Sequence, residues 1–203
     1  MIKPVKAILF DFGGVIAEEG FREGIKAVGR LNGLEPEAFF RLADDLIYET
    51  EYVTGKAGEA DFWGVLRERS GIRQSDSELR EEVLRRFTLR ADVLELVDGV
   101  RNLGLTVAIL SDQTNWLDEL DQKNPFYHRF DLVFNSYKTG KGKRDPSFFR
   151  DVCRALGVAP DEALFIDDNL KNIERARGEG LRTIHFRSVP ELRLALKTHL
   201  PGL

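Results

Sequence analysis

Five short apolar runs constrain the fold of this chain more than any other feature of its sequence. They are VKAILF (5–10), LTVAIL (105–110), FDLVFN (130–135), EALFID (162–167) and RTIHF (182–186). Each is about as long as a buried β-strand, and most lack the strict alternation of apolar and polar residues that marks a strand with one face in water. Runs of this kind are typical of a parallel sheet that is covered on both faces.

Helical patterns separate the later runs. They occupy residues 92–103, 145–156 and 169–179, and the first and last of them stop before Gly104 and Gly180, a common position for glycine at the end of a helix. Strands that alternate with helices indicate βαβ crossovers. The sequence therefore predicts an α/β fold with a doubly wound parallel sheet.

The first crossover is the exception. Between the first two runs lie about 75 residues with no convincing strand, but with helical patterns around 21–31, 36–53, 58–70 and 76–89. A βαβ crossover usually needs only a few tens of residues. We interpret this stretch as a helical insert with hinges near 17–20 and 88–92. The predicted organisation is a core of residues 1–17 and 91–203 and an inserted domain of residues 18–90.

Composition and charge exclude several classes of protein. The net charge is −4, and no basic cluster with interleaved aromatics is present, so nucleic acid and anionic membranes are not expected as partners. The single cysteine, Cys153, permits no intrachain disulfide and no CxxC site, and the three histidines are scattered. No signal peptide is evident, and no apolar run approaches ~18 residues. We expect a soluble cytoplasmic protein, and no pattern indicates its oligomeric state.

Polar residues follow four of the apolar runs, where the strands would end. In open α/β sheets, ligands bind beyond the carboxyl ends of the strands. The residues in these positions are Asp11, Gly13 and Gly14 after the first run, Ser111 and Asp112 after the second, Lys141, Lys143 and Arg144 on a loop after the third, and Asp167 and Asp168 after the fourth. We expect these side chains to meet at one edge of the sheet.

Three of these residues suggest a metal site. Asp11, Asp167 and Asp168 would repel one another, since two unit charges ~4 Å apart cost about 4 kcal/mol at an effective dielectric of 20. A cation removes this repulsion, and oxygen ligands without histidine or cysteine favour Mg²⁺.

The same group of residues suits phosphate chemistry. A carboxylate can attack phosphorus to form an aspartyl-phosphate, which divides one difficult hydrolysis into two steps. Ser111 and nearby backbone N–H groups can hold the phosphate, and a lysine can offset the charge of the transition state. Gly13 and Gly14 allow the backbone to approach the metal and the phosphate closely.

Four segments carry a resemblance to a known family. FDFGGVI (10–16), ILSD (109–112), GKGKRDPSFF (140–149) and FIDDNLKN (165–172) resemble, in order and spacing, the four motifs of the haloacid dehalogenase superfamily of hydrolases. The resemblance covers essentially the whole chain. It implies a Rossmann-like core, and the insert stands where that family has its helical cap of the first type.

The resemblance also implies roles for individual residues. Asp11 would be the nucleophile and a Mg²⁺ ligand, and the other ligands would be the carbonyl of Gly13 and the acids Asp167 and Asp168. Lys143, which aligns better than Lys141 because DP and FF follow it, would be the catalytic lysine. The implied phosphate-binding set is Gly13, Gly14, Ser111, Asp112 and Lys143. Asp112 and Arg144 replace the usual Asn and Pro, and Asn172 would steady the acidic loop.

Position 13 is the departure that matters most. Family phosphatases have a second Asp there that acts as general acid and then base, whereas Gly13 has no proton to donate. General acid–base help contributes about 10²–10⁴-fold, so its loss is expected to slow a phosphatase without abolishing it. Asp112 is one candidate to compensate, although we favour for it a cap on the helix that starts near Thr114.

Two features of the insert have an ordinary structural interpretation. Glu18 and Glu19 lie at the first hinge, where solvated residues are more common than residues in contact with a substrate. An aromatic stripe at near-helical spacing is more often core than specificity wall, although a few of its members can line the site; the members are Phe39, Phe40, Tyr48 and Tyr52.

The leading functional hypothesis is a Mg²⁺-dependent phosphatase that acts on a small phosphorylated metabolite, such as a sugar phosphate. One alternative is a catalytically silent protein that binds a phosphate ligand or a protein partner, which Gly13, Asp112 and Arg144 favour. The other is a 2-haloacid dehalogenase. The retained acid pair at 167–168 disfavours it, since dehalogenases of this superfamily need no metal and typically carry a Tyr at position 13.

Overall fold

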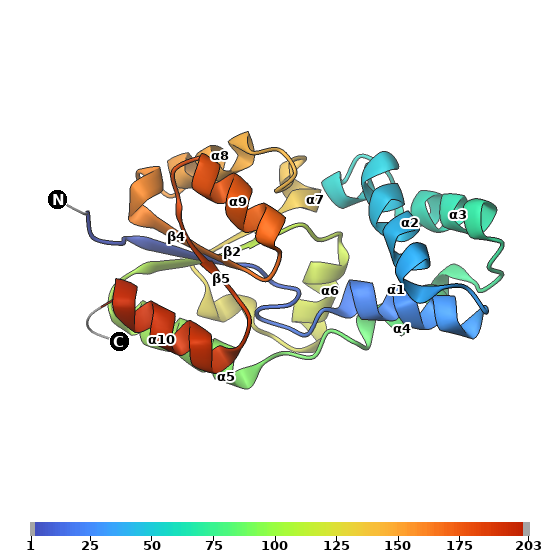
Figure 1. Cartoon of the computed structure of the whole chain (residues 1–203), viewed down its shortest axis with the longest axis horizontal. Helices are drawn as coiled ribbons and strands as arrows, with labels where there is room; N and C mark the ends of the chain where they lie inside the picture. The colour runs from blue at the N-terminus through green and yellow to red at the C-terminus, as the bar shows by residue number, and fades with distance from the viewer. Residues whose placement is uncertain (1–2, 201–203) are drawn as a thin grey trace.

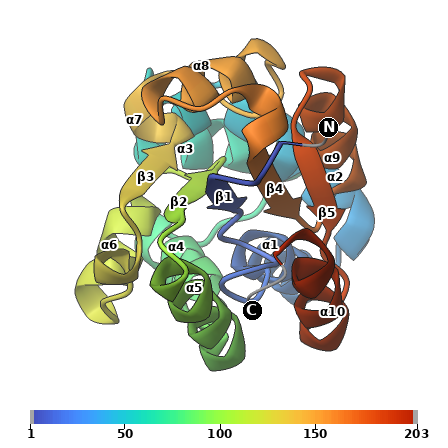
Figure 2. The same cartoon turned by 90° about the vertical axis from the view of Figure 1, so that its left-hand side faces the viewer.

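The computed structural model describes residues 3–200 of the chain. Its centre is a five-stranded parallel sheet with the strand order β3-β2-β1-β4-β5 (Figure 2). The strands are β1 (Ala7–Phe10), β2 (Thr106–Ser111), β3 (Leu132–Asn135), β4 (Ala163–Asp167) and β5 (Arg182–His185). Four of them fall within the apolar runs and β2 extends one residue beyond its run, to Ser111, so the predicted strands and the parallel sheet are confirmed.

Helices cover both faces of this sheet, which makes a three-layer α/β fold (Figure 2). On one side lie α5 (Ala91–Asn102) and α10 (Val189–His199), and on the other lie α8 (Ser147–Ala155) and α9 (Leu170–Gly178). Residues of β1 point alternately to the two sides, because Ile8 and Phe10 belong to one apolar cluster and Leu9 to the other. All four residues of β1 are buried, as expected for the central strand.

The predicted helices at 92–103, 145–156 and 169–179 correspond to α5, α8 and α9. The sequence analysis placed the start of α6 (Trp116–Lys123) near Thr114 without giving its extent, and it did not define α10. It did not anticipate the short helical turns, which are η1 (Tyr52–Thr54), η2 (Tyr127–Arg129), α7 (Ser136–Thr139) and η3 (Pro160–Glu162). None of the helices within residues 3–200 is long and apolar enough to cross a membrane.

Four helices connect β1 to α5 and lie at one end of the molecule, beyond the carboxyl ends of the strands (Figure 1). They are α1 (Gly20–Leu31), α2 (Pro36–Glu49), α3 (Glu59–Ser70) and α4 (Asp76–Leu84). The helical patterns predicted for the insert are therefore confirmed, although α2 and α4 end earlier than expected. That residues 18–90 form a separate domain stays a prediction.

The two chain segments that lead into and out of the helical insert run side by side. The Glu18 N–H donates to the Thr88 carbonyl at 2.9 Å, and the Arg90 N–H donates to the Ile16 carbonyl at 2.8 Å. Ala17 forms an antiparallel bridge with Leu89. The helical insert is thus joined to the sheet by two neighbouring backbone segments that are hydrogen-bonded to each other.

Candidate active site

Three carboxylates meet at the edge of the sheet. Asp11 directly follows β1, Asp167 ends β4 and Asp168 comes next, and one oxygen from each lies within 4.8 Å of the others. The strand register explains this, because Phe10 pairs with Ile166 of β4 and both strands end at the same level. Asp167 is fully buried, Asp11 is nearly so and Asp168 is half-buried. The predicted convergence of these three acids is what the structure shows.

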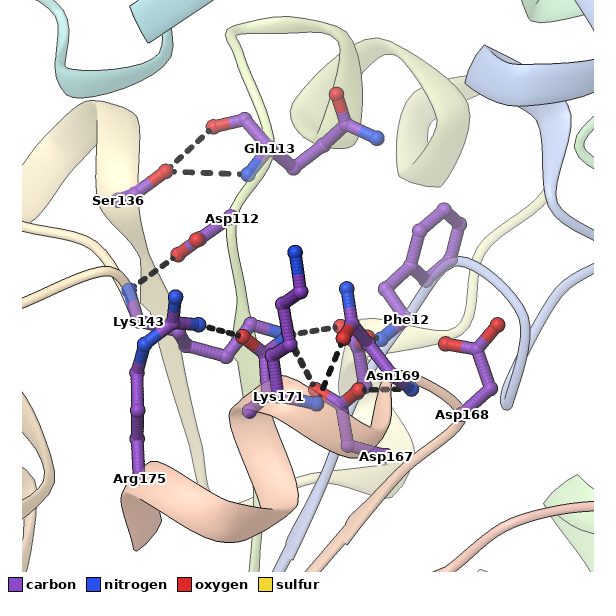
Figure 3. A network of polar contacts seen from close by, with 12 residues as sticks. Phe12, Asp112, Gln113, Ser136, Lys143, Asp167, Asp168, Asn169, Lys171 and Arg175 are labelled. Atoms are coloured by element: carbon purple, nitrogen blue, oxygen red, sulfur yellow. Dashed lines mark hydrogen bonds and ion pairs between the residues drawn. The ribbon is translucent and has the colours of Figure 1, made fainter. Parts of the chain in front are cut away.

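Lys143 lies between two of these acids (Figure 3). Its Nζ is 2.8 Å from Asp11 Oδ1 and 2.7 Å from Asp167 Oδ2, and only 2% of the side chain is exposed. Burial alone would lower the pKa of Lys143, but the carboxylates of Asp11 and Asp167 outweigh burial and raise it well above its usual value. The lysine therefore stays charged and offsets part of the repulsion among the acids.

The neighbouring lysine lies outside this cluster. Lys141 Nζ is 2.7 Å from Asp151 Oδ2 and 3.5 Å from Asp145 Oδ2, on the side of α8. The resemblance favoured Lys143 over Lys141 by alignment, but only the geometry could show which lysine lies near the acids. The structure places Lys143 beside Asp11.

Asp11 is held through one of its two oxygens. Oδ1 accepts both the Phe12 N–H, at 2.7 Å, and the Lys143 ammonium. Burial raises the pKa of Asp11 well above its usual value, and the Asp167 carboxylate adds to this effect while Lys143 opposes it. A buried carboxylate with fixed orientation and nearby like charge is a suitable position for a nucleophile or a metal ligand.

Asp167 is oriented by its own loop (Figure 3). The Asn169 N–H donates to Oδ1 at 2.7 Å, and Asn172 Nδ2 donates to Oδ2 at 3.1 Å. Arg175 in turn donates to Asn172 Oδ1 at 3.0 Å, which fixes the amide with its nitrogen toward the acid. Burial raises the pKa of the Asp168 carboxyl group above its usual value, and the negative charge of Asp167 adds to this effect.

The two glycines after β1 differ in what a side chain would meet. Gly14 has φ +85°, and a Cβ atom there would lie 2.4 Å from Asp168 Oδ2, so this position accepts only glycine while Asp168 stays in place. A Cβ atom at residue 13 would instead lie 3.5 Å from Phe87 and 3.6 Å from Glu19 Oε1, which are ordinary contacts. Sterics therefore require the glycine at 14 but not the one at 13.

Ser111 ends β2 and Asp112 follows it, beside this cluster. Ser111 is buried and lines the same cavity as Asp11. Asp112 uses both of its oxygens on protein groups: Oδ2 accepts the Tyr48 hydroxyl at 2.6 Å, and Oδ1 accepts the Lys143 N–H at 2.8 Å. Asp112 thus joins α2 to the loop that carries Lys143.

One expectation about Asp112 was wrong. Asp112 does not cap the next helix, because the Trp116 N–H donates instead to Thr114 Oγ1, at 3.3 Å. The aromatic stripe of the insert is divided between core and cavity: Tyr52 and Phe39 are buried, whereas Phe40 and Tyr48 are the members that line the cavity over the acids. The orientation of α2 decides this, and helical spacing alone does not reveal it.

Arg144 makes a second contact with α2. Its guanidinium lies 3.4 Å from the centroid of the Tyr48 ring, and Nη2 is 2.8 Å from Asp44 Oδ2. The sequence analysis missed Asp44. The available signal was its i,i+4 spacing from Phe40 and Tyr48, which places all three on one face of the helix.

A cavity of about 420 Å³ lies between the sheet edge and the helices. Asp11, Ser111, Lys143 and Asp168 line it from the sheet side, and Phe21, Arg22, Phe40 and Tyr48 line it from α1 and α2. A second cavity, of about 670 Å³, is lined by Gly14, Glu19, Asp168 and several arginines, among them Arg86 and Arg90. Glu19 and Asp168 line both cavities, so the acid cluster stands at their junction.

The fold and this cluster define the class of protein: a doubly wound α/β enzyme with an acid cluster at the carboxyl edge of its sheet. A family model described as haloacid dehalogenase-like hydrolase matches residues 5–180, and the chain belongs to this family of hydrolases. The resemblance that the four motifs indicated is thereby confirmed.

Similar proteins include characterised phosphatases. The chain is 32% identical to the phosphoserine phosphatase of Thermus thermophilus over 88% of its own length and 80% of the relative's. It is 25% identical to the N-acetylmuramic acid 6-phosphate phosphatase of Pseudomonas aeruginosa, over 90% of this chain and 82% of that one. Among solved structures, a haloacid dehalogenase family enzyme of Bacteroides thetaiotaomicron, in complex with magnesium and inorganic phosphate, superposes with a TM-score of 0.71. It shares 26% identity, over 90% of this chain and 94% of that one.

Proposed function

We propose that this protein is a Mg²⁺-dependent phosphatase that hydrolyses a small phosphorylated metabolite through an aspartyl-phosphate on Asp11. The observation that carries the proposal is the cluster of Asp11, Asp167 and Asp168, with Lys143 bonded to two of them, at the floor of a covered cavity. The phosphatases among the similar proteins and the magnesium and phosphate in the Bacteroides enzyme support it.

The residues present fit a magnesium ion. The three side chains offer only carboxylate oxygens, the ligands that Mg²⁺ prefers, and Gly14 leaves open the space beside Asp168 that a side chain would fill. We propose that Asp11, the Gly13 carbonyl, Asp167 and Asp168 hold the ion. When bound, Mg²⁺ would neutralise charge on the phosphate and on the acids around it.

The chain's own groups account for the positioning of the reaction. Phe12 and Lys143 hold Asp11 through Oδ1, so Oδ2 is the oxygen proposed to attack phosphorus. The Ser111 hydroxyl, the Lys143 ammonium and the backbone around Gly13 and Gly14 would bind the phosphate oxygens. Asn172 keeps Asp167 in place, and the half-buried Asp168 lies on the cavity side.

The helical insert would act as a cap over this site. Phe21 and Arg22 at the start of α1, with Phe40 and Tyr48 on α2, line the cavity opposite the acids. A cap in this position would exclude water and contact the part of the substrate that leaves. The cavity of about 420 Å³ carries both charged and aromatic side chains, which suits a small polar phosphomonoester; a sugar phosphate belongs to this class.

Hydrolysis of p-nitrophenyl phosphate tests the proposal. This leaving group needs little protonation, so the assay probes the nucleophile and the metal alone. We expect turnover that depends on Mg²⁺ and that falls by at least ~10³-fold in Asp11→Asn, which keeps the shape of the side chain but removes the nucleophile. Folded wild-type protein that binds Mg²⁺ without turnover would support the ligand-binding alternative, and chloride release without Mg²⁺ would support a dehalogenase.

A further inference from the structure

The cavity contains a carboxyl group that has no role yet in the proposed phosphatase reaction. An alcohol leaves poorly as an alkoxide, so cleavage of an ordinary phosphomonoester needs a proton donor beside the leaving oxygen. Six carboxyl side chains line the cavity: Asp11, Glu19, Asp44, Asp45, Asp112 and Asp168. Any proton donor that the protein supplies as a carboxylic acid is therefore among these six.

Four of the six are committed elsewhere. Asp11 and Asp168 belong to the acid cluster. Both oxygens of Asp112 accept hydrogen bonds from protein groups, and Asp44 is paired with Arg144. Asp45 is exposed on α2, which leaves Glu19, whose carboxyl group lies beside residue 13 of the nucleophile's loop.

Glu19 lies opposite the glycine that follows the nucleophile by two residues. From the Cβ position of residue 13, Glu19 Oε1 is 3.6 Å away and Glu19 Cδ is 3.8 Å away. A side chain on residue 13 would therefore contact both the Phe87 ring, at 3.5 Å, and the Glu19 carboxyl group. Glu19 lines the same cavity as Asp11 and lies next to the position where Gly13 has no side chain.

The contacts around Glu19 distinguish it from its neighbour. Within residues 3–200, no ion pair involves Glu19. Its side chain makes one hydrogen bond, in which Oε1 accepts the Arg22 N–H at 3.5 Å and caps the start of α1, and its backbone carbonyl accepts the Glu23 N–H at 3.3 Å. Glu18 instead makes a two-pronged ion pair with Arg90, at 2.7 and 3.0 Å. Adjacent glutamates on one segment thus have different environments, one tied to an arginine and one directed at the cavity.

The segment that carries Glu19 is held in position. A Cβ atom at Gly20 would lie 2.4 Å from the Phe87 ring, so the chain at 20 packs directly against this aromatic, which also lies beside Gly13. The hydrogen bond of Glu18 N–H with Thr88 fixes the same segment to the returning chain. Such support on both sides gives the Glu19 carboxyl group a defined place relative to Asp11.

We propose that Glu19 is the general acid and base of this enzyme and replaces the side chain that Gly13 lacks. The inference rests on the proposed phosphatase function. As Asp11 Oδ2 bonds to phosphorus, the bond from phosphorus to the leaving oxygen breaks, and that oxygen takes the bonding electron pair and the Glu19 proton. Water then attacks the aspartyl-phosphate and gives a proton to the Glu19 carboxylate, while the electron pair of the cleaved P–O bond returns to Asp11.

Glu19→Gln tests this assignment with two substrates. The amide keeps an oxygen that can accept the Arg22 N–H but cannot give up a proton. For the alkyl ester glycerol 2-phosphate we expect kcat to fall by about 10²-fold or more. For p-nitrophenyl phosphate, whose leaving group needs no proton, we expect the release of p-nitrophenol in a single turnover, before the aspartyl-phosphate is hydrolysed, to fall by less than ~10-fold. Glu18→Gln, the same change one residue away, should keep the wild-type ratio of the two rates.

A relocation of the carboxyl group provides a second, independent variant. Residue 13 has room for a side chain, so Gly13→Asp combined with Glu19→Ala moves the acid across the gap. We expect this double variant to hydrolyse glycerol 2-phosphate at least ~10-fold faster than Glu19→Ala alone. Failure of this rescue, while p-nitrophenyl phosphate turnover shows a working site, would count against the proposal.

The remaining outcomes are also decisive. Equal losses in single-turnover release of the leaving group from both substrates in Glu19→Gln would show that Glu19 only supports the start of α1, and an unchanged release of glycerol from glycerol 2-phosphate would exclude it as the proton donor. If wild-type protein turned over neither substrate with Mg²⁺, the phosphatase proposal itself would fall and this inference with it. Normal wild-type turnover with an unchanged substrate ratio in the variant would remove the Glu19 assignment alone.

Discussion

At the scale of single residues, the site depends on small differences between neighbours. Gly13 and Gly14 are both glycine, but only residue 14 has a positive φ and an acid within 2.4 Å of its Cβ position. Lys141 and Lys143 are two residues apart, yet only Lys143 reaches Asp11. In each pair only one of the two residues lies against the acid cluster.

Substitution of the two glycines measures this difference. Gly14→Ala forces a Cβ atom into the Asp168 carboxylate at an unfavourable φ, so we expect the free energy of unfolding to fall by about 1–3 kcal/mol. Gly13→Ala meets only ordinary contacts and should change it by less than ~0.5 kcal/mol. Urea denaturation of both variants without Mg²⁺ gives these values. Equal effects at the two positions would show that the contact between residue 14 and Asp168 does not constrain the loop.

At the scale of elements, α2 is bound to the sheet edge by polar contacts. The Tyr48 hydroxyl bonds to Asp112 at 2.6 Å, and Arg144 lies on the Tyr48 ring and pairs with Asp44. These contacts bring α2 down on the loops that carry Ser111 and Lys143. The position of the helix over the cavity therefore depends on a few side chains at its end.

Tyr48→Phe removes one of these contacts and keeps the ring under Arg144. A hydrogen bond of about 1 kcal/mol corresponds to roughly a fivefold change in an equilibrium constant, so we expect KM for p-nitrophenyl phosphate to rise about fivefold. Tyr127→Phe is the matched control, because its hydroxyl bonds to Asp118 at 3.0 Å away from the cavity. Steady-state kinetics on both variants provide the comparison. The same KM in Tyr48→Phe as in the control would show that this contact does not hold α2 over the substrate.

At the scale of the whole molecule, the sequence predicted what depends on strand order and register. Asp11, Ser111 and Asp167 each stand at the end of a buried apolar run, and parallel strands in register bring such ends together. The contacts of Tyr48 with Asp112 and the approach of Glu19 to Gly13 were not predictable. They depend on how the helical insert is oriented over the sheet, which local periodicity does not encode.

The acid cluster also joins distant parts of the chain, because residue 11 and residues 167–168 meet only in the folded state. An ion that binds the folded protein alone stabilises it by about 2.7 kcal/mol when its concentration is 100 times Kd. At a Mg²⁺ concentration of 100 times Kd, we expect the free energy of unfolding to be higher by about 2.7 kcal/mol than in an EDTA-treated sample. Excess EDTA should reverse this gain.

Asp168→Asn isolates the cluster as the source of that gain. It removes one carboxylate and leaves both of the Lys143 contacts in place, so the variant should stay folded but lose most of its response to Mg²⁺. Asp44→Asn changes an equally charged residue that pairs with Arg144 and should keep the wild-type response. Urea denaturation with and without Mg²⁺ measures both. If Asp168→Asn gained as much stability from Mg²⁺ as wild type, the ion would have to bind elsewhere, and the sheet-edge cluster would lose its assignment as the metal site.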